Sequence, residues 1–545
     1  MALGLYHPPT PINEPILSYA PGTQERKTLK AALDRFSPGA PKDLPLVIGG
    51  KRRKGAGSMD VTCPHAKREV LARCAQANTA DAEAAVGAAL AAQKDWSRFP
   101  FAERASVFLK AADRLAGEYR AEINAATMMG QGKSVHQAEI DAACELIDFL
   151  RFNVYFAQKI YESQPLYSPR GLWNRSEARA LEGFVFAVGP FNFTAISVNL
   201  ATAPALMGCT VVWKPAPTAV LASYLMLEVL EKSGLPPGVI NFIAGEPEVM
   251  GKTVLGNPNL AGIHFTGSTT TFQHLWSTVG QNIASYKTYP RIVGETGGKD
   301  FVFAHSSADP QELITALIRG AFEYQGQKCS AASRAFIPRT LWKQIKDKLV
   351  AETEMIKMGD PRDFSNFMNA VIDARAFVKI KGYIDHAKQA SDAKILCGGE
   401  CDDSVGYFVR PTIIEAINPL YRSMTEEIFG PVLTIYVYDD NKEAEAVKLC
   451  EESTAYGLTG AVMACDRMAI DRLSRSFLNT AGNFYINDKP TGAVVGQQAF
   501  GGGRKSGTND KAGSEWNLAR WVSFRSVKEN FLPLTDYRYD FMKEG

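Results

Sequence analysis

The chain has 545 residues, too many for one compact core, so two or three domains are expected. Hydrophobic residues make up 46% and charged residues 22%, which is typical of a soluble globular protein. The net charge of +2 gives no electrostatic reason to expect a nucleic-acid partner. No stretch approaches the ~20 apolar residues that span a bilayer, so no membrane partner is expected.

The N-terminus lacks the basic region and apolar stretch of a secretory signal, and Glu14 precedes the first Arg or Lys. We therefore expect a cytoplasmic protein, or a mitochondrial matrix protein from which a leader has been removed. Nine scattered cysteines favour a reducing compartment over a disulfide framework.

The first part of the chain reads as helical. Residues 1 to about 60 are rich in Pro and Gly and predict an irregular lead-in with one helix over 25–36, and the basic run at 51–54 predicts a solvated loop. Thr79 is a candidate cap for an Ala-rich helix that ends at Trp96. Further helices are expected over 102–119 and, with breaks, over 121–157.

From residue 183 short apolar runs alternate with helical stretches. Strands are expected over 184–188, 210–213, 239–244, 262–265 and 289–293, with helices over 195–207, 218–233, near 248–255 and after Gly267. A second alternation, with strands over 333–337, 432–438 and 482–486, runs from about 300 to 509. This texture predicts two doubly wound α/β domains, with a junction near Gly294. Residues 166–181 and the tail after 510 fit neither repeat.

Two features indicate a dinucleotide site. The strand over 262–265 leads through Thr266-Gly267-Ser268 into a helix, and free N–H groups at a helix start attract a pyrophosphate. Lys214 follows another strand, at the edge where open α/β sheets bind ligands. Each feature also occurs in proteins that bind no nucleotide, and no G-x-G-x-x-G fingerprint is present.

Cys329 is the candidate nucleophile. Small and polar residues surround it, and the cation of Lys328 should lower the pKa of its thiol. The other eight cysteines, such as Cys74, Cys209 and Cys450, lie in apolar patterns and are expected to be buried. Cys397 and Cys401 have no accompanying Cys or His pair, so no metal site is predicted.

Three polar side chains complete the candidate chemistry. Glu295 is flanked by glycines at a strand end, which suits a general base, although a turn glutamate is the simpler interpretation. Asn192 offers an amide donor that would stabilise an oxyanion. Glu427 could accept hydrogen bonds from ribose hydroxyls.

The motifs PFNF, WKP, FTGS, GETGGK, GQKCS and EIFGP occur in the order and spacing of the aldehyde dehydrogenase superfamily, which the chain resembles. The segments GFVFAVGPFNFTAISVNLATAPALMG, FEYQGQKCSAASR, AGNFYINDKPTGAVVGQQAFGG and SGTNDKAG resemble its Δ1-pyrroline-5-carboxylate (glutamate γ-semialdehyde) dehydrogenase family. The resemblance implies an NAD-binding domain over 1–165 and 184–293 and a catalytic domain over 294–509. It also implies a small β oligomerisation arm with a C-terminal tail, over 166–183 and 510–545, and at least a homodimer.

The resemblance also implies roles for individual residues. Cys329 would attack the aldehyde of L-glutamate γ-semialdehyde, Asn192 and the Cys329 N–H would hold the oxyanion, and Glu295 would activate water to release L-glutamate. The residues implied to bind NAD are Phe191, Lys214, Gly267, Ser268, Glu427 and Phe429. The residues implied to bind substrate are Glu145, Phe193, Lys328, Ser330, Gly492, Ala493 and Phe500.

Three positions depart from the pattern. Ala493 replaces a serine of relatives, Phe272 stands where the wider superfamily has a glycine, and Pro217 stands where many NAD-selective members have an acidic residue. NADP therefore stays open as the cofactor. The alternatives are another short semialdehyde or an aliphatic aldehyde as substrate, a CoA-acylating enzyme, against which Glu295 argues, and an inactive binding homologue.

Overall fold

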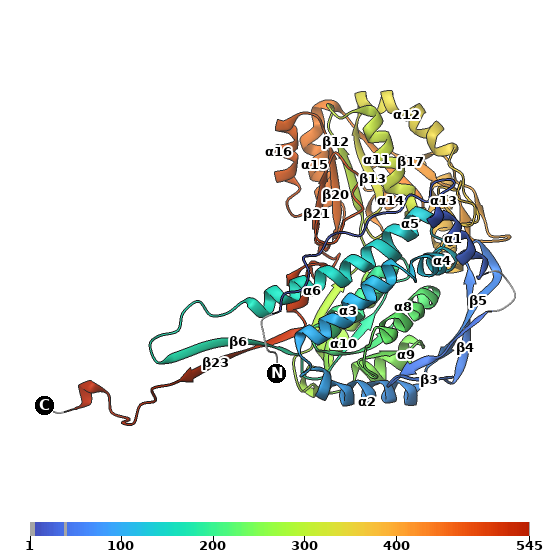
Figure 1. Cartoon of the computed structure of the whole chain (residues 1–545). Coiled ribbons are helices and arrows are strands. Elements are labelled where there is room, and N and C mark those ends of the chain that lie inside the picture. The colour runs from blue at the N-terminus through green and yellow to red at the C-terminus, as the bar shows by residue number, and fades with distance from the viewer. Residues whose placement is uncertain (1–5, 37–40, 544–545) are drawn as a thin grey trace.

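Two seven-stranded sheets organise the residues that the computed structural model describes, 6–36 and 41–543 (Figure 1). The first sheet has the order β11-β10-β7-β8-β9-β2-β3. Its strands are β2 (Leu46–Ile48), β3 (Lys51–Arg53), β7 (Phe184–Val188), β8 (Thr210–Lys214), β9 (Ile240–Phe242), β10 (Leu260–Thr266) and β11 (Arg291–Glu295). Strands β7 to β11 pair in parallel, and all seven residues of β10 are buried, as expected for a parallel strand covered on both faces.

Helices cover this sheet and form most of the N-terminal body. They are α1 (Gln24–Asp34), α2 (Thr79–Trp96), α3 (Phe101–Ala116), α4 (Arg120–Gln131), α5 (Val135–Ala138), α6 (Leu146–Glu162), α7 (Thr194–Leu206), α8 (Val220–Lys232), α9 (Pro247–Met250) and α10 (Thr269–Gln281). Two π-helical turns, η1 (Glu139–Glu145) and η3 (Gly251–Leu255), continue α5 and α9. The predicted breaks between residues 121 and 157 are thus the loop 132–134 before α5 and the π-helix η1 after it.

The N-terminal region contains strands that the sequence reading missed. β1 (Lys42–Leu44), β5 (Ala66–Gln76) and β4 (Gly57–Cys63) form a separate sheet, and the basic run is the exposed edge strand β3 instead of a loop. The predicted irregular lead-in also includes residues 1–5 and 37–40, which lie outside the described residues. The cap of α2 is Asn78 and not Thr79, because Asn78 and Asp81 exchange side-chain to backbone hydrogen bonds.

The second sheet has the order β14-β17-β18-β13-β12-β20-β21, parallel except for β14. Its strands are β12 (Asp300–Ala304), β13 (Ala332–Pro338), β14 (Ala393–Cys397), β17 (Thr412–Ala416), β18 (Val432–Tyr438), β20 (Thr459–Met463) and β21 (Asn483–Ile486). The helices around it are α11 (Pro310–Phe322), α12 (Arg339–Glu354), α13 (Ala374–Gln389), α14 (Arg422–Thr425), α15 (Glu443–Glu452) and α16 (Arg467–Ser476). The predicted α/β class with two sheets is confirmed.

A two-stranded arm leaves the body (Figure 1). It pairs β6 (Leu172–Ala180) antiparallel with β23 (Val522–Asn530). The chain before β23 belongs to the body, since α17 (Glu515–Ala519) is followed by the buried Trp521, whose ring lies 4.6 Å from that of His264. Among the described residues no helix combines the length and apolarity that crossing a bilayer requires.

Candidate active site

One cavity of about 340 Å³ lies between the two domains and collects the predicted substrate-binding residues. Its wall includes Glu145, Phe193, Lys328, Ser330, Gly492, Ala493 and Phe500, together with the candidate nucleophile Cys329. These residues come from η1, from the loop before α7, from the turn before β13 and from the loop after β21. The structure therefore gathers residues from four separate segments of the sequence around one thiol.

Cys329 follows a sharply turned segment. Tyr324 and Gln325 adopt left-handed backbone angles, with φ of 53° and 57°, in the 3₁₀ turn that ends at Gly326. Gln325 is held there because its amide donates to the carbonyls of Gly132, at 2.9 Å, and Ala370, at 2.8 Å. Strain of this kind persists only where surrounding contacts fix it, and it is frequent at active sites.

The expectation that Lys328 lowers the pKa of Cys329 is wrong. The Lys328 ammonium donates to Glu323 at 3.1 Å, and burial together with Asp300, Glu295 and Glu427 raises the pKa of the Cys329 thiol well above its usual value. Lys328 lines the cavity as predicted, but as the partner of Glu323. The thiol therefore needs a base before it can act as a nucleophile.

The candidate oxyanion donor Asn192 lies beside the turn that carries the candidate nucleophile Cys329. Its amide donates to the Gln327 carbonyl at 3.0 Å, two residues before Cys329, and the side chain is buried. Asp141 fixes the end of the loop that carries Asn192, because its carboxylate accepts hydrogen bonds from the N–H groups of Thr194 and Ala195 at 2.9 and 2.8 Å. The first turn of α7, directly after Asn192 and Phe193, is thus capped by a buried carboxylate.

Asp141 is itself paired with a lysine that the sequence reading did not identify. Lys133 donates to Asp141 at 2.6 Å and lies over the rings of Phe193, at 4.0 Å, and Tyr324, at 4.6 Å. Lys133 and Asp141 are about 1% and 0% exposed, so this is a buried ion pair. It connects the aromatic wall of the cavity to the turn before Cys329. In the sequence both residues look like ordinary helix residues, and no local signal marks them.

Glu295 ends β11 and is partly buried. Its carboxylate accepts from the Gly502 N–H at 3.3 Å, and burial raises its pKa well above the usual value, while Lys511 acts in the opposite direction. A carboxylate with a raised pKa is a stronger base near neutral pH. The same carboxylate contributes to the raised pKa of Cys329, so the two groups interact electrostatically.

The residues predicted for the dinucleotide line the carboxyl edge of the first sheet. Lys214 ends β8, Gly267 follows β10, and Ser268 caps α10 by accepting from the Thr271 N–H at 3.2 Å. The first N–H groups of a helix have no partner within it, so this turn can receive a phosphate. The Phe272 ring packs against Gly294, so closely that a Cβ added at Gly294 would lie 2.1 Å from it. The same ring stacks on the ring of Phe265.

Glu427, Phe429 and Phe191 approach from both domains. The Gly298 N–H donates to Glu427 at 2.9 Å, and the rings of Phe191 and Phe429 meet edge to face at 5.6 Å. A Cβ at Gly297 would lie 2.4 Å from the Glu427 carboxylate, and one at Gly298 would lie 2.3 Å from the Cys329 carbonyl. The two glycines of GETGGK therefore make room for a candidate cofactor residue and for the nucleophile backbone.

The cavity wall carries both signs of charge. Ser330 donates to Thr491 at 2.8 Å, Gly492 has φ of 103°, and the Lys489 ammonium lies close to Gly492. Sequence reasoning missed the other charged groups of this wall, which are Glu14, Asp148, Arg319, Glu323 and Lys489. They lie on helix faces or distant loops, and only the tertiary fold brings them together.

The nine cysteines are free. Six of the eight other than Cys329 are buried as expected, whereas Cys401 is half-buried and Cys465 is exposed. The Cys63 sulfur lies with His65 and Glu69 in a group whose ligand atoms are within 4.8 Å of one another. The Arg362 cation lies close to this group and counteracts the pKa increase of Cys63, so we assign no metal to it.

Comparison with known proteins places this geometry in context. Residues 52–527 match the model of the aldehyde dehydrogenase family. The chain is 53% identical to the mitochondrial delta-1-pyrroline-5-carboxylate dehydrogenase of Dictyostelium discoideum, over 98% of this chain and 96% of that protein. It is 49% identical to the mitochondrial human protein of the same name, over 97% and 94%.

A solved structure agrees over the whole chain. The delta-pyrroline-5-carboxylate dehydrogenase of Mycobacterium tuberculosis, crystallised with NAD, superposes with a TM-score of 0.96 at 53% identity and covers 100% of both chains. A mutant form of the 1-pyrroline-5-carboxylate dehydrogenase of Thermus thermophilus gives a TM-score of 0.90 at 32% identity, over 97% of this chain and 100% of that one.

Proposed function

This chain belongs to the aldehyde dehydrogenase family, and from that premise we propose that it oxidises L-glutamate γ-semialdehyde to L-glutamate with reduction of NAD. The semialdehyde is in equilibrium with Δ1-pyrroline-5-carboxylate, so the reaction would be the second step of proline catabolism. Full-length relatives of about 50% identity carry that name.

The single observation that carries the substrate proposal is the charge of the cavity. Cys329 lies at a wall that also contains the carboxylates of Glu145 and Asp148 and the cations of Arg319 and Lys489. An amino-acid semialdehyde has one carboxylate and one ammonium group at its far end, and a site with both signs of charge can pair both groups. An unsubstituted aldehyde would leave these charges of the cavity wall without a ligand partner.

The residues present fit NAD. We assign the pyrophosphate to the Gly267–Ser268 turn, the adenosine ribose to Lys214, and the nicotinamide ribose to Glu427, with Phe191 and Phe429 beside the ring. Because Gly297 has no side chain, the Glu427 carboxylate can occupy the space that a Cβ at this position would fill. The first sheet would then belong to the NAD-binding domain and the second to the catalytic domain. Glu246, which acts electrostatically on Lys214, favours NAD because it would repel the additional phosphate of NADP.

We assign the chemistry as follows. The Cys329 thiol loses its proton to Glu295 and its sulfur attacks the aldehyde carbon, while Asn192 and the Cys329 N–H donate to the oxyanion. Bound NAD supplies the acceptor for the hydride that leaves this carbon. Glu295 then passes the thiol proton to solvent and removes a proton from a water molecule, whose oxygen attacks the thioester carbon. The carbon–sulfur bond breaks, the carboxylic acid leaves, and the Cys329 thiolate takes its proton back from Glu295.

We further propose that the β6–β23 arm mediates assembly of at least a homodimer. Its two strands have exposed edges, and Trp173 and Phe524 expose 53% of their surface each. For the compartment, relatives are named mitochondrial, and we propose the mitochondrial matrix or the cytoplasm of a bacterial cell.

The test follows NADH formation at 340 nm with glutamate semialdehyde, succinate semialdehyde and propanal, with NAD and with NADP. Cys329→Ala is the control and should be inactive. We expect glutamate semialdehyde to exceed propanal at least hundredfold in kcat/KM, a difference of about 2.7 kcal/mol. Equal rates for propanal would refute the substrate proposal, and no oxidation of any aldehyde would refute the enzyme itself.

A further inference from the structure

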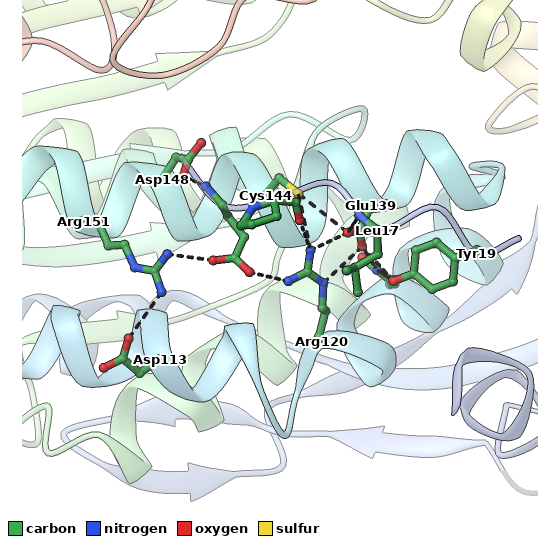
Figure 2. Close-up of polar contacts among 11 residues, drawn as sticks. Leu17, Tyr19, Asp113, Arg120, Glu139, Cys144, Asp148 and Arg151 are labelled. Atoms are coloured by element: carbon green, nitrogen blue, oxygen red, sulfur yellow. Dashed lines mark hydrogen bonds and ion pairs between the residues drawn. The ribbon is translucent and has the colours of Figure 1, made fainter. Parts of the chain in front are cut away.

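An N-terminal segment, residues 13–19, lies across η1 and α6 and is here called the strap. Figure 2 shows how its residues meet the side chains of these helices. Asn13, Glu14 and Ile16 line the same cavity as Cys329, so the strap forms part of the substrate wall. The family match begins only at residue 52, and the strap therefore lies outside the part of the chain that defines the general family.

Asn13 connects the two sides of the cavity. Its amide donates to Asp148 of α6 at 2.7 Å and to the Val495 carbonyl at 2.8 Å, and its oxygen accepts from Gln497 at 3.0 Å. Val495 and Gln497 lie three and five residues after Gly492, in the loop 491–498, which lines the cavity. We assign this loop to the carboxylate end of the substrate. One side chain from the start of the chain thus holds a loop that lies 482 residues away.

The strap is fixed in place by a buried ionic network (Figure 2). One carboxylate oxygen of Glu14 accepts a hydrogen bond from Arg120, and the other accepts one from Arg151 at 2.7 Å. Arg120 also donates to the Pro15 carbonyl at 2.7 Å and pairs with Glu139 of η1. Because these charges are largely withdrawn from water, the loss of one partner is costly, and the strap has a single well-defined position.

The backbone of the strap joins the same network. The Leu17 N–H and the Tyr19 hydroxyl donate to Glu139 at 2.9 and 2.7 Å. Burial alone would raise the pKa of Glu139, but hydrogen bonds from Arg120, Leu17 and Tyr19 outweigh it and leave that pKa below its usual value. Glu139 is therefore a carboxylate whose bonds to the strap stabilise its charged form.

We propose that the strap is a specificity element and that Asn13 is a positioning residue for the loop 491–498. A glycine-containing loop with φ of 103° at Gly492 has many accessible conformations when it is free. Fixing it before the substrate arrives removes the entropy cost of ordering the loop upon binding. This proposal rests on the proposed function, because it assigns the loop to the carboxylate end of the substrate. Aldehydes without that group gain nothing from the strap.

The test compares Asn13→Ala with Ser18→Ala in the full chain. Ser18 lies on the same strap but is exposed, and its hydroxyl donates to Glu25 at 3.4 Å and accepts from the Ala20 N–H at 3.3 Å, away from the cavity loop. We expect Asn13→Ala to raise the KM for glutamate semialdehyde about tenfold with kcat within twofold of wild type, and to leave the kinetics of propanal unchanged. Ser18→Ala should match wild type with both aldehydes.

A second readout does not depend on the substrate. Hydrogen–deuterium exchange of the amides at 494–498 should become at least about tenfold faster in Asn13→Ala and not in Ser18→Ala. Unchanged exchange would overturn the positioning role, and an equal loss of propanal activity would show general damage and overturn the specificity role. If wild type itself shows no preference for glutamate semialdehyde, the proposed function fails, while the exchange data still decide whether Asn13 positions the loop.

Discussion

The two glycines that follow Glu295 make separable predictions. In Gly297→Ala the new Cβ would lie 2.4 Å from one oxygen of Glu427 and 2.7 Å from its carboxyl carbon, whereas ordinary contacts begin at 3.4 Å. The Glu427 carboxylate must move by roughly 1 Å, which is enough to break its 2.9 Å hydrogen bond from the Gly298 N–H. In Gly298→Ala the Cβ would instead lie 2.3 Å from both the Cys329 carbonyl and a carboxylate oxygen of Asp300, so the backbone of the candidate nucleophile and the Asp300 side chain have to shift.

The expected effects follow from what moves. Loss of one hydrogen bond to a charged carboxylate costs about 1.5–3 kcal/mol, so Gly297→Ala should bind NAD about 10 to 150 times more weakly. Its Cys329 should still react with iodoacetamide at the wild-type rate. Gly298→Ala should show the opposite pattern, with slower alkylation and a loss of kcat.

Isothermal titration calorimetry with NAD and single-turnover alkylation of Cys329 measure the two effects. Gly87→Ala is the matched control, because a Cβ at Gly87 of α2 meets nothing within 4 Å and alanine is the better helix former. The reasoning is refuted if Gly297→Ala retains NAD affinity within twofold of wild type, or if both variants lose the same property.

Three further predictions concern buried charges. Glu295→Gln should reduce kcat by about 10²–10⁴ and remove the rise of activity with pH, because the wild-type base has a raised pKa and works only when deprotonated; a rise that persists would exclude Glu295 as the base. Lys133→Met should lower the free energy of unfolding in urea by about 3–5 kcal/mol, because it leaves Asp141 charged and buried, and a loss under ~1 kcal/mol would contradict this. Burial raises the pKa of Asp300 to about 8, so its contribution to stability is present at low pH and is lost as pH rises toward 8. Relative to Asp300→Asn, wild type should therefore become less stable in urea between pH 5 and pH 9, and parallel curves would disprove it.

The sequence predicted those parts of the site that lie within short motifs. The strands that end near Lys214 and Gly267 could be predicted, because a short apolar run that ends at a polar residue or a glycine is compatible with few other structures. The predicted strands 184–188 and 432–438 have the bounds of β7 and β18. Strands β4 and β5 were missed because their charged residues and flanking glycines resemble a loop, and only pairing with each other and with β1 makes them strands.

The direction in which side chains point was the main feature that could not be predicted from the sequence. Lys328 is next to Cys329 in the chain, but its ammonium turns to Glu323, so adjacency gave the wrong sign for the pKa of the thiol. The pair of Lys133 and Asp141 and the contact from Asn13 to Val495 join segments that no local pattern connects. Contacts of this type arise from packing, and their residues have no distinctive neighbours in the sequence.

The arm also constrains how this protein can be made. Strand β6 ends at Ala180, and its partner β23 begins at Val522, so β6 leaves the ribosome 342 residues earlier. At bacterial or eukaryotic rates of about 5–20 residues per second, β6 waits roughly 17 to 70 seconds without its partner. Its alternating charges, Arg175, Glu177 and Arg179, are well suited to that interval, because they oppose pairing with strands of neighbouring nascent chains. The proposed assembly through the arm would then follow release of the finished chain, so that monomer folding comes first and association second.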